Sequence, residues 1–392
     1  MRLLGFNYLK IQRILTLTIA ITLSSTLFSL TALSLLGFYK GFSLYLGEDE
    51  NIIALYDRKS RTPFTGLVPL YLAERISVLE GVIAISPETA VPCILNNEQV
   101  FLRGVIPEEF TKLNQITIID GEMLRMDDIS AVMLGMNIAE KLGLRAGSSI
   151  LILGVLKEQY LEMRIKGVFA SNSVMDDEVI APLYVGQWLR GTDYGHVTLI
   201  RFKIDRNLIS ASEIFEMIAR ETGDTSQAPP ASQEPQTPII IPRIITRFRI
   251  EDLGIEEAKN VMKNYMERYG ITREALLTLS VMIFILSSSS IFSAAETILQ
   301  QHKKEVEVIR SVGASKKTLK HDLLAKLLIW SAFGSAAGAA AAITILKVAE
   351  TISKLQILSH TITFSTDPLI ISTSIALTAM IVSISILRAD LK

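Results

Sequence analysis

The sequence predicts a membrane protein with four transmembrane α-helices and a large α+β extracytoplasmic domain inserted between helices 1 and 2. Of its 392 residues, 49% are hydrophobic and only 20% are charged, and the mean hydropathy is +0.38. The apolar residues collect in four runs, each long enough to cross about 30 Å of hydrocarbon. Between the first two runs lies a polar segment, residues 40–274, which is long enough to form its own core.

The four predicted spans follow from length and apolar content. They cover residues 14–39, 275–299, 323–349 and 368–387. The first and fourth contain no charged residue, while Glu296, Lys326 and Lys347 lie near the ends of the second and third, where long side chains reach the interface. The first run is too long for the apolar part of a signal peptide, which holds about 7–15 residues.

Lysines and arginines near the spans predict the orientation. Arg2, Lys10 and Arg13 precede the first span, and Arg388 and Lys392 follow the fourth. Between the second and third spans stand Lys303, Lys304, Arg310, Lys316, Lys317 and Lys320. The four spans predict a multi-pass protein of the cell membrane. Its orientation follows from these basic residues, because loops rich in lysine and arginine stay in the cytoplasm. Both termini and the loop 300–322 are predicted to be cytoplasmic, and residues 40–274 extracytoplasmic.

Short apolar runs and helical spacings alternate along residues 40–274. Strands are predicted at 51–56, 81–85, 100–106, 150–153, 161–169 and 197–204. Helices are predicted at 70–79 and 211–220, and residues 131–144 read as a strand followed by a short helix that ends at Gly143. Strands and helices mixed in this way are typical of an α+β domain.

Two further segments complete this domain. Residues 222–242 are rich in proline and polar residues, so we expect a disordered loop that is not a site. Residues 255–269 have apolar side chains at helical spacing, and only Gly270 interrupts the run towards the second span. This pattern predicts a stalk helix over 255–274 that is nearly continuous with the span.

Residues 304–320 form the most informative part of the predicted cytoplasmic loop. We expect a short amphipathic helix, a break at Gly313, and a basic helix that enters the third span. Val306, Ile309 and Val312 have the spacing of one buried helix face. On physical grounds alone, a basic loop that only fixes the topology accounts for this pattern equally well.

This loop resembles that of the FtsX-like, MacB-type permeases of ABC transporters. The matching residues are Lys304, Glu305, Arg310, Gly313, Ala314, Ser315, Lys316 and Lys317. The polar segment resembles the MacB-type periplasmic core domain at residues 101–105, 119–122, 132–144, 165–169 and 177–183. The order of the parts also agrees. Two positions depart from the family: Glu307 replaces a common small residue, and Lys326 a common acidic one.

The resemblance implies a permease subunit that is not itself an enzyme and has no cofactor. A second permease subunit, either a copy or a relative, would pair with it in the lipid bilayer. A separate cytoplasmic ATPase would bind ATP and move the extracytoplasmic domain, for export or mechanotransmission. The implied contacts with the ATPase are an elbow helix at residues 1–13 and Lys304, Glu305, Arg310, Gly313, Ala314 and Ser315.

Two other functions are open at this point. An FtsX-like regulator would use the extracytoplasmic domain to activate a protein partner such as a cell-wall hydrolase. A membrane-anchored receptor would have no ATPase at all. A net charge of −1 provides no field for attracting nucleic acid.

Motifs for other chemistries are missing from the sequence. It contains no G-x-x-x-x-G-K-[ST], no G-x-S-x-G and no paired zinc ligands, and its four histidines are scattered. Asp176, Asp177 and Glu178 could hold a cation, but we expect an exposed acidic turn, because adjacent carboxylates do not all converge. No charge lies near the centre of a span, which argues against an ion-coupled carrier.

Gly334 and Gly338 form a G-x-x-x-G in the third span, which permits close helix packing. Packing within one subunit and packing at a dimer interface are equally compatible with the pattern.

Overall fold

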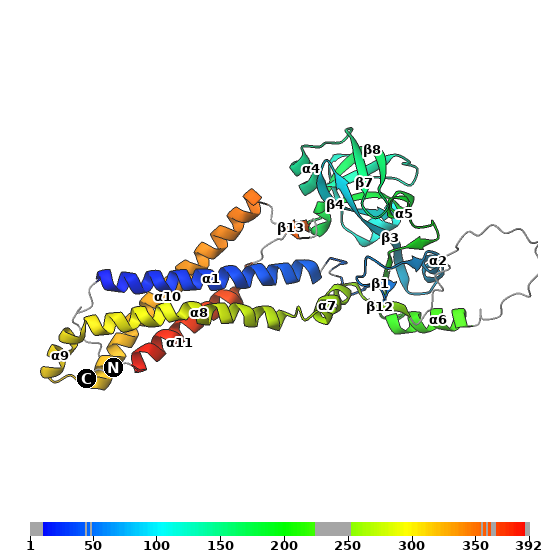
Figure 1. The fold of residues 1–392 in the computed structure, drawn as a ribbon. Helices are drawn as coiled ribbons and strands as arrows, with labels where there is room; N and C mark the ends of the chain where they lie inside the picture. Colours follow the sequence, from blue (N-terminus) through cyan, green and yellow to red (C-terminus); the bar gives the residue numbers. More distant parts are fainter. Residues whose placement is uncertain are drawn as a thin grey trace, which may run out of the picture. The chain divides into compact units, whose positions relative to one another are not determined.

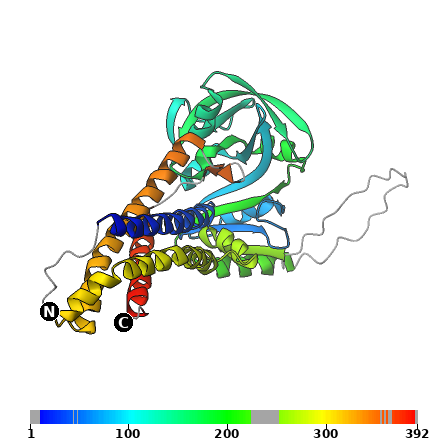
Figure 2. The same cartoon turned by 60° about the vertical axis from the view of Figure 1, so that its left-hand side comes forward.

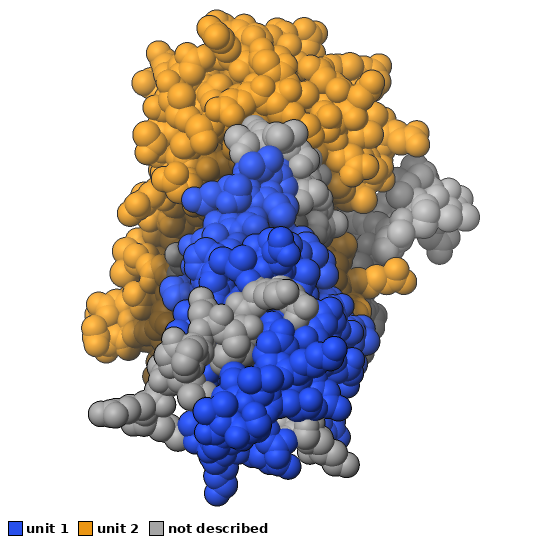
Figure 3. Space-filling view, turned by 90° about the vertical axis from the view of Figure 1, so that its left-hand side faces the viewer, with its two compact units in different colours: residues 1–40, 270–355, 362–392 blue, residues 41–269, 356–361 orange. Residues whose placement is uncertain are grey.

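The protein forms two compact units. The computed structural model describes residues 11–43, 45–47, 49–223, 252–353, 356–357, 360–361 and 366–388. The helical unit lies within residues 1–40, 270–355 and 362–392, and the α+β unit within residues 41–269 and 356–361 (Figure 3). The predicted elbow helix falls outside the described residues up to residue 10, as does the predicted loop from residue 224 onward.

Within its described residues, the helical unit contains four helices long and apolar enough to cross a membrane, as predicted. They are α1 (Ile11–Ser43), α8 (Arg273–Gln301), α10 (Lys316–Ser353) and α11 (Pro368–Arg388) (Figure 1). A short helix, α9 (Lys303–Ser311), connects α8 to α10. Helix α11 packs against both α8 and α10, and apolar side chains from all five helices share one core.

Small residues bring α1 and α10 into close contact. A Cβ at Gly338 would lie 2.5 Å from the carbonyl oxygen of Thr22, whose hydroxyl in turn donates to the carbonyl of Gly334 at 3.2 Å. The hydroxyl of Ser25 lies 2.7 Å from that of Ser374 on α11. The structure thus places both glycines of the G-x-x-x-G within one subunit, where backbones approach closely and hydroxyls bond across helices.

We predict that Gly338→Ala destabilises the helical unit by about 1–3 kcal/mol, because the added methyl group meets backbone atoms of α1. The measurement is denaturant unfolding in detergent, followed by the fluorescence of Trp330 on α10 in a Trp188→Phe background. Gly41→Ala is the matched control, since nothing lies within 4 Å of a Cβ at Gly41 on α1. Equal stability of the two variants would contradict this packing.

The α+β unit is built on a ten-stranded mixed sheet. Its strands are β1 (Ile52–Asp57), β3 (Val82–Leu95), β4 (Glu98–Val105), β5 (Thr117–Gly121), β6 (Ala131–Gly135), β7 (Ser149–Gly154), β8 (Gln159–Ala170), β9 (Glu178–Pro182), β11 (Leu199–Ile204) and β12 (Leu253–Glu257). The strand order is β12-β1-β11-β3-β4-β9-β6-β8-β5, and β7 pairs with both β3 and β8. Every strand predicted from the sequence is present.

Helices and short strands complete this unit. The helices are α2 (Tyr71–Ser77), α3 (Pro107–Leu113), α4 (Met136–Leu142), α5 (Leu183–Arg190), α6 (Ala211–Gly223) and α7 (Ala258–Arg268). Two-residue strands form two further pairs: β2 (Val68–Pro69) with β10 (His196–Val197), and β13 (Gln356–Ile357) with β14 (His360–Thr361). Helix α4 ends at Gly143, which adopts the left-handed conformation predicted for a helix stop.

Six strands of the sheet close on themselves. The pairings β3-β4, β4-β9, β9-β6, β6-β8, β8-β7 and β7-β3 form a ring, seen as curved strands at the top of Figure 2. Alternate side chains of all six strands fill its interior, as in a small barrel. The first half of β3 extends beyond the ring and pairs with β11 in an open sheet.

The open sheet carries a different helix layer on each face. Helices α2 and α6 share a core with one face of β1 and β11. Helix α7 packs on the other face of β1, through Ala258, Val261 and Met262. Phe42 in the last turn of α1, and Tyr45 and Leu46 beyond it, belong to the same cluster as α7.

The stalk helix predicted over 255–274, nearly continuous with the second span, is wrong at both ends, because helix α7 covers only Ala258–Arg268. Residues up to Glu257 belong to strand β12, because Leu253–Glu257 supplies the pairing partner that the edge of β1 needs. Helix α7 then ends at Arg268, Gly270 takes a φ of 75°, and Thr272 caps the start of α8 by accepting from the amide of Ala275 at 3.0 Å. A turn therefore separates the two helices.

Candidate functional site

The loop singled out in the sequence has the predicted helix–break–helix form. Helix α9 ends at Ser311, Gly313 has a φ of 106°, and Ser315 caps α10 by accepting from the amide of Thr318 at 3.1 Å. Val306 is buried in the apolar core that α9 shares with α1, α8, α10 and α11. The other candidate residues have partly or fully exposed side chains: Lys304, Glu305, Arg310, Gly313, Ala314 and Ser315.

The predicted buried face of this loop is wrong at Val312. Val306 is buried and Ile309 is partly buried, but Val312 is 85% exposed. Helical spacing does not determine which way Val312 faces, because α9 ends one residue earlier. Val308 is also 63% exposed, so the end of α9 presents two apolar side chains beside an exposed glycine. Exposed apolar groups of this kind mark contact surfaces more often than isolated surface residues do.

Lys326, which departs from the family pattern, has a local partner. Its ammonium lies 2.8 Å from a carboxylate oxygen of Asp322, one turn earlier on α10, and Asp322 is buried. Nearby, the Lys320 ammonium donates to the carbonyl of Leu387 at 2.9 Å, near the end of α11. These contacts stabilise the ends of α10 and α11 that adjoin the α9 loop.

The α+β unit contains a second site that sequence reasoning missed. Glu88 on β3, Arg103 on β4, Glu178 on β9 and Arg201 on β11 form a fully buried charge cluster. Arg103 donates to Glu88 at 2.6 Å and makes a two-pronged contact with Glu178 at 2.6 and 2.9 Å. Arg201 donates to the other oxygen of Glu88 at 2.6 Å. The two positive and two negative charges balance, as buried ions require.

The charge cluster also contacts the chain that leaves α1. The hydroxyl of Tyr45 donates to Glu178, and Arg201 donates to the carbonyl of Leu46 at 2.8 Å. The guanidinium of Arg103 lies 5.1 Å from the centre of the Tyr45 ring. Burial, with Glu178 alongside, raises the pKa of Tyr45 well above its usual range, so the phenol stays protonated and acts as a donor.

The two arginines respond differently to the cluster. Burial opposes the charge on Arg103, but the carboxylates of Glu178 and Glu88 together raise its pKa above the usual value. Burial also acts on Arg201 and lowers its pKa, because its ion pair with Glu88 offsets only part of the loss of hydration. Both guanidinium groups nevertheless remain charged at neutral pH.

The predicted exposed acidic turn at Asp176, Asp177 and Glu178 is wrong, because all three residues are buried. Asp176 accepts from the backbone amide of Ser171 at 2.6 Å, and Glu178 belongs to the charge cluster. The turn packs so closely on β6 that a Cβ at Gly135 would lie 2.3 Å from the carbonyl oxygen of Asp176. Among the described residues, no group of three or more His, Cys, Asp or Glu side chains could hold a metal ion.

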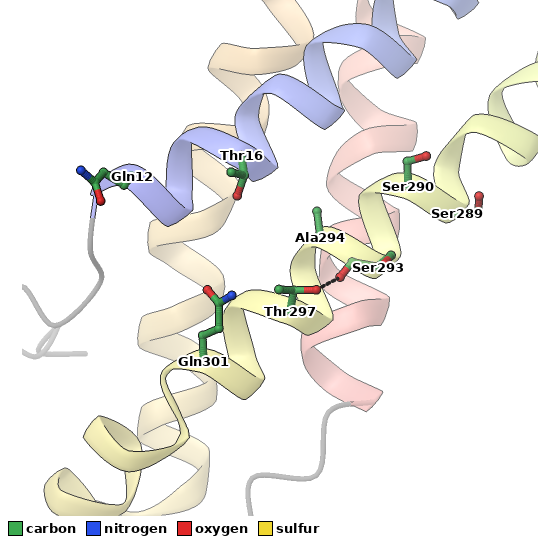
Figure 4. A pocket seen from close by; sticks show the side chains of 8 residues that line it. All are labelled: Gln12, Thr16, Ser289, Ser290, Ser293, Ala294, Thr297 and Gln301. Atoms are coloured by element: carbon green, nitrogen blue, oxygen red, sulfur yellow. Dashed lines mark hydrogen bonds between the residues drawn. The ribbon is translucent and has the colours of Figure 1, made fainter.

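A polar groove of about 750 Å³ runs between α1 and α8 (Figure 4). Its lining residues are Gln12, Thr16, Ser289, Ser290, Ser293, Ala294, Thr297 and Gln301. None of these side chains is charged, and the hydroxyl of Thr297 donates to the carbonyl of Ser293 one turn earlier. Of the four candidate spans, α8 is the least buried within the chain, and its residues that line the groove are exposed except for Ala294, which is partly buried.

Residues 277–389 match the model of the FtsX-like permease C-terminal family. This region contains nearly all of α8 and the whole of α9, α10 and α11. No curated protein matches the chain.

Three solved structures resemble part of the chain. The periplasmic region of MacB from Actinobacillus actinomycetemcomitans has 14% identity and a TM-score of 0.37, covering 55% of this chain and 92% of that one. The extracellular domain of the noncanonic ABC-type transporter YknZ from Gram-positive bacteria has 13% identity and a TM-score of 0.34, covering 44% of this chain and 95% of that one. A domain of a putative permease protein from Porphyromonas gingivalis has 14% identity and a TM-score of 0.31, covering 45% of this chain and 85% of that one.

We predict that Glu178→Gln destabilises the α+β unit by roughly 3–5 kcal/mol, because it leaves two buried arginines with a single carboxylate. Denaturant unfolding, followed by the fluorescence of Trp188 on α5 in a Trp330→Phe background, measures the change. The control is Glu216→Gln, which removes an exposed pair with Arg220 and is expected to cost less than about 1 kcal/mol. A similar loss of stability in the two variants would show that the charge cluster does not stabilise the α+β unit.

Proposed function

We propose that this chain, whose residues 277–389 match the FtsX-like permease C-terminal family, is the permease subunit of an ABC transporter. A separate cytoplasmic ATPase hydrolyses ATP, and the permease couples that hydrolysis to movement of its extracytoplasmic α+β unit, for export or mechanotransmission. The family match carries the proposal, because it covers α9 together with three of the four candidate spans. The positive charges flanking the spans support cytoplasmic termini and a cytoplasmic α9 loop.

The α9 loop is the proposed contact with the ATPase. Val308 and Val312 supply apolar surface, and Lys304, Glu305 and Arg310 supply charges around it. A small apolar centre with a polar rim is the usual composition of a specific protein interface. Because Val306 packs in the core shared with α1, α8, α10 and α11, a push on the exposed side of α9 is transmitted to that helical core.

The polar groove between α1 and α8 is the proposed contact with the second permease subunit. Hydroxyl groups on a lipid-facing surface gain little from the surrounding hydrocarbon, whereas a neighbouring helix can accept their hydrogen bonds. The serines of α8 are also small, which permits a close approach. The partner subunit is either a copy of this chain or a related one.

A regulatory role is the second candidate function. The β7–β8 hairpin exposes Leu151, Val155, Leu156 and Tyr160, which favours a protein partner for the α+β unit. A regulator would activate such a partner, for example a cell-wall hydrolase, and would still bind an ATPase. A receptor without an ATPase would bind none, so copurification separates the receptor from the other two functions.

We predict that Val312→Asp reduces copurification with the cognate ATPase at least tenfold, because a carboxylate replaces an apolar contact. The measurement is affinity isolation of the full chain co-expressed with that ATPase. Val78→Asp is the control, since Val78 is 81% exposed but lies on the α+β unit. Gly313→Val should act like Val312→Asp, because a β-branched residue is strained at a φ of 106°. If both loop variants bind the ATPase as the wild type does, the loop only fixes the topology of the chain.

We also predict that Ser293→Cys forms a disulfide between two permease subunits under mild oxidation in membranes, detected as a dimer on a non-reducing gel. The native Cys93 does not interfere, since it is buried and burial raises its pKa to about 12, so almost no reactive thiolate is present at neutral pH. Ile329→Cys on α10 is the control, because its side chain is 70% exposed away from the groove. Cross-linking at position 329 alone would place the interface elsewhere.

A further inference from the structure

The two links between the helical unit and the α+β unit are built differently. At the first link, α1 runs without interruption past the unit boundary at Lys40 and ends at Ser43, and Phe42 already packs in the cluster formed with α7. At the second link, the boundary falls at Gly270, in the turn between α7 and α8. Nothing lies within 4 Å of a Cβ at Gly270, and the hydroxyl of the preceding Tyr269 makes only a long hydrogen bond of 3.5 Å to the carbonyl of Arg61, so tertiary contacts hold this turn weakly.

Beyond α1, the chain is held by the buried charge cluster. Tyr45 and Leu46 are both buried. The Tyr45 hydroxyl donates to Glu178 on β9, and the Leu46 carbonyl accepts from Arg201 on β11. Residues of two strands therefore bind two consecutive residues of the first link, and Arg103 on β4 lies against the Tyr45 ring.

We infer that the charge cluster is the anchor through which α1 moves the sheet, and that the turn at residues 269–272 is a joint that lets α8 change direction. Arg201 and Glu178 are then positioning residues: they transmit displacement of α1 to β9 and β11 without touching any substrate. The movement of α1 in this inference rests on the proposed function, since the ATPase supplies the displacement. The anchor itself is a property of the chain alone.

The cluster suits this role because its contacts are short, charged and protected from water. Hydrogen bonds to ionised groups are stronger than neutral ones, and water cannot compete for them in a buried site. The joint has the opposite properties, since Gly270 has a φ of 75° and is exposed. A load applied along α1 therefore reaches the centre of the sheet, whereas a load along α8 is first taken up by the turn.

Hydrogen exchange of the full-length protein in lipid nanodiscs tests the anchor. Tyr45→Phe removes only the hydroxyl and keeps the ring beside Arg103. We expect amide exchange in peptides covering residues 42–51 to accelerate about tenfold or more, while exchange in β4 and β9 stays unchanged. The matched control is Tyr184→Phe, which removes a hydroxyl that donates to the carbonyl of Ile129; Tyr184 lies on α5, outside the cluster that contains the first link.

The outcomes separate the two proposals. Unchanged exchange at residues 42–51 in Tyr45→Phe would overturn the anchor, and so would uniform acceleration across the whole sheet, which is the signature of a merely structural role. In the complex with the ATPase, ATP should alter exchange in β9 and β11 of the wild type but not of Tyr45→Phe, at similar rates of ATP hydrolysis. An ATP response that Tyr45→Phe retains would contradict transmission through the cluster. Failure of any ATPase to bind would overturn the proposed function and leave the anchor standing.

Discussion

The α+β unit depends on the neutrality of one buried cluster of four charges. Removing ions from water is costly, and two arginines can lie at the centre of a sheet only because two glutamates lie within 2.6 Å of their nitrogens. Four strands must be in register at the same time for this balance to exist: β3, β4, β9 and β11. The cluster therefore stabilises one arrangement of the sheet more than it stabilises the sheet in general.

Local sequence patterns predicted much of this architecture. Long apolar runs identified all four candidate spans, and alternating or helical spacing identified the main strands and several helices. These features depend on neighbouring residues, which a single sequence displays directly. Strands β7 and β8 were predicted for the same reason.

Features that depend on distant pairing were not predicted. Arg103 and Glu178 meet because β4 and β9 run parallel, although 75 residues separate them in the chain. A charged residue inside each of several apolar strands was the available signal, but it does not specify which strands pair. The same limitation explains the errors at residues 176–178, buried by packing on β6, and at residues 255–257, recruited as a strand by β1. The error at Val312 arose because the apolar residues keep their helical spacing beyond Ser311, where α9 ends.

The ring of six strands constrains how the domain can be recombined. Apart from the first half of β3, which pairs with β11, its strands lie within residues 90–182, an uninterrupted segment whose two ends are adjacent in space, since Ala90 pairs with Arg103 and Arg103 with Ile180. A segment with neighbouring ends can be exchanged between relatives as a cassette. The charge cluster crosses this boundary, with Arg103 and Glu178 inside the cassette and Glu88 and Arg201 outside. A transferred segment must therefore carry both Arg103 and Glu178. If it lacks one of them, the buried charges of the recipient protein no longer balance.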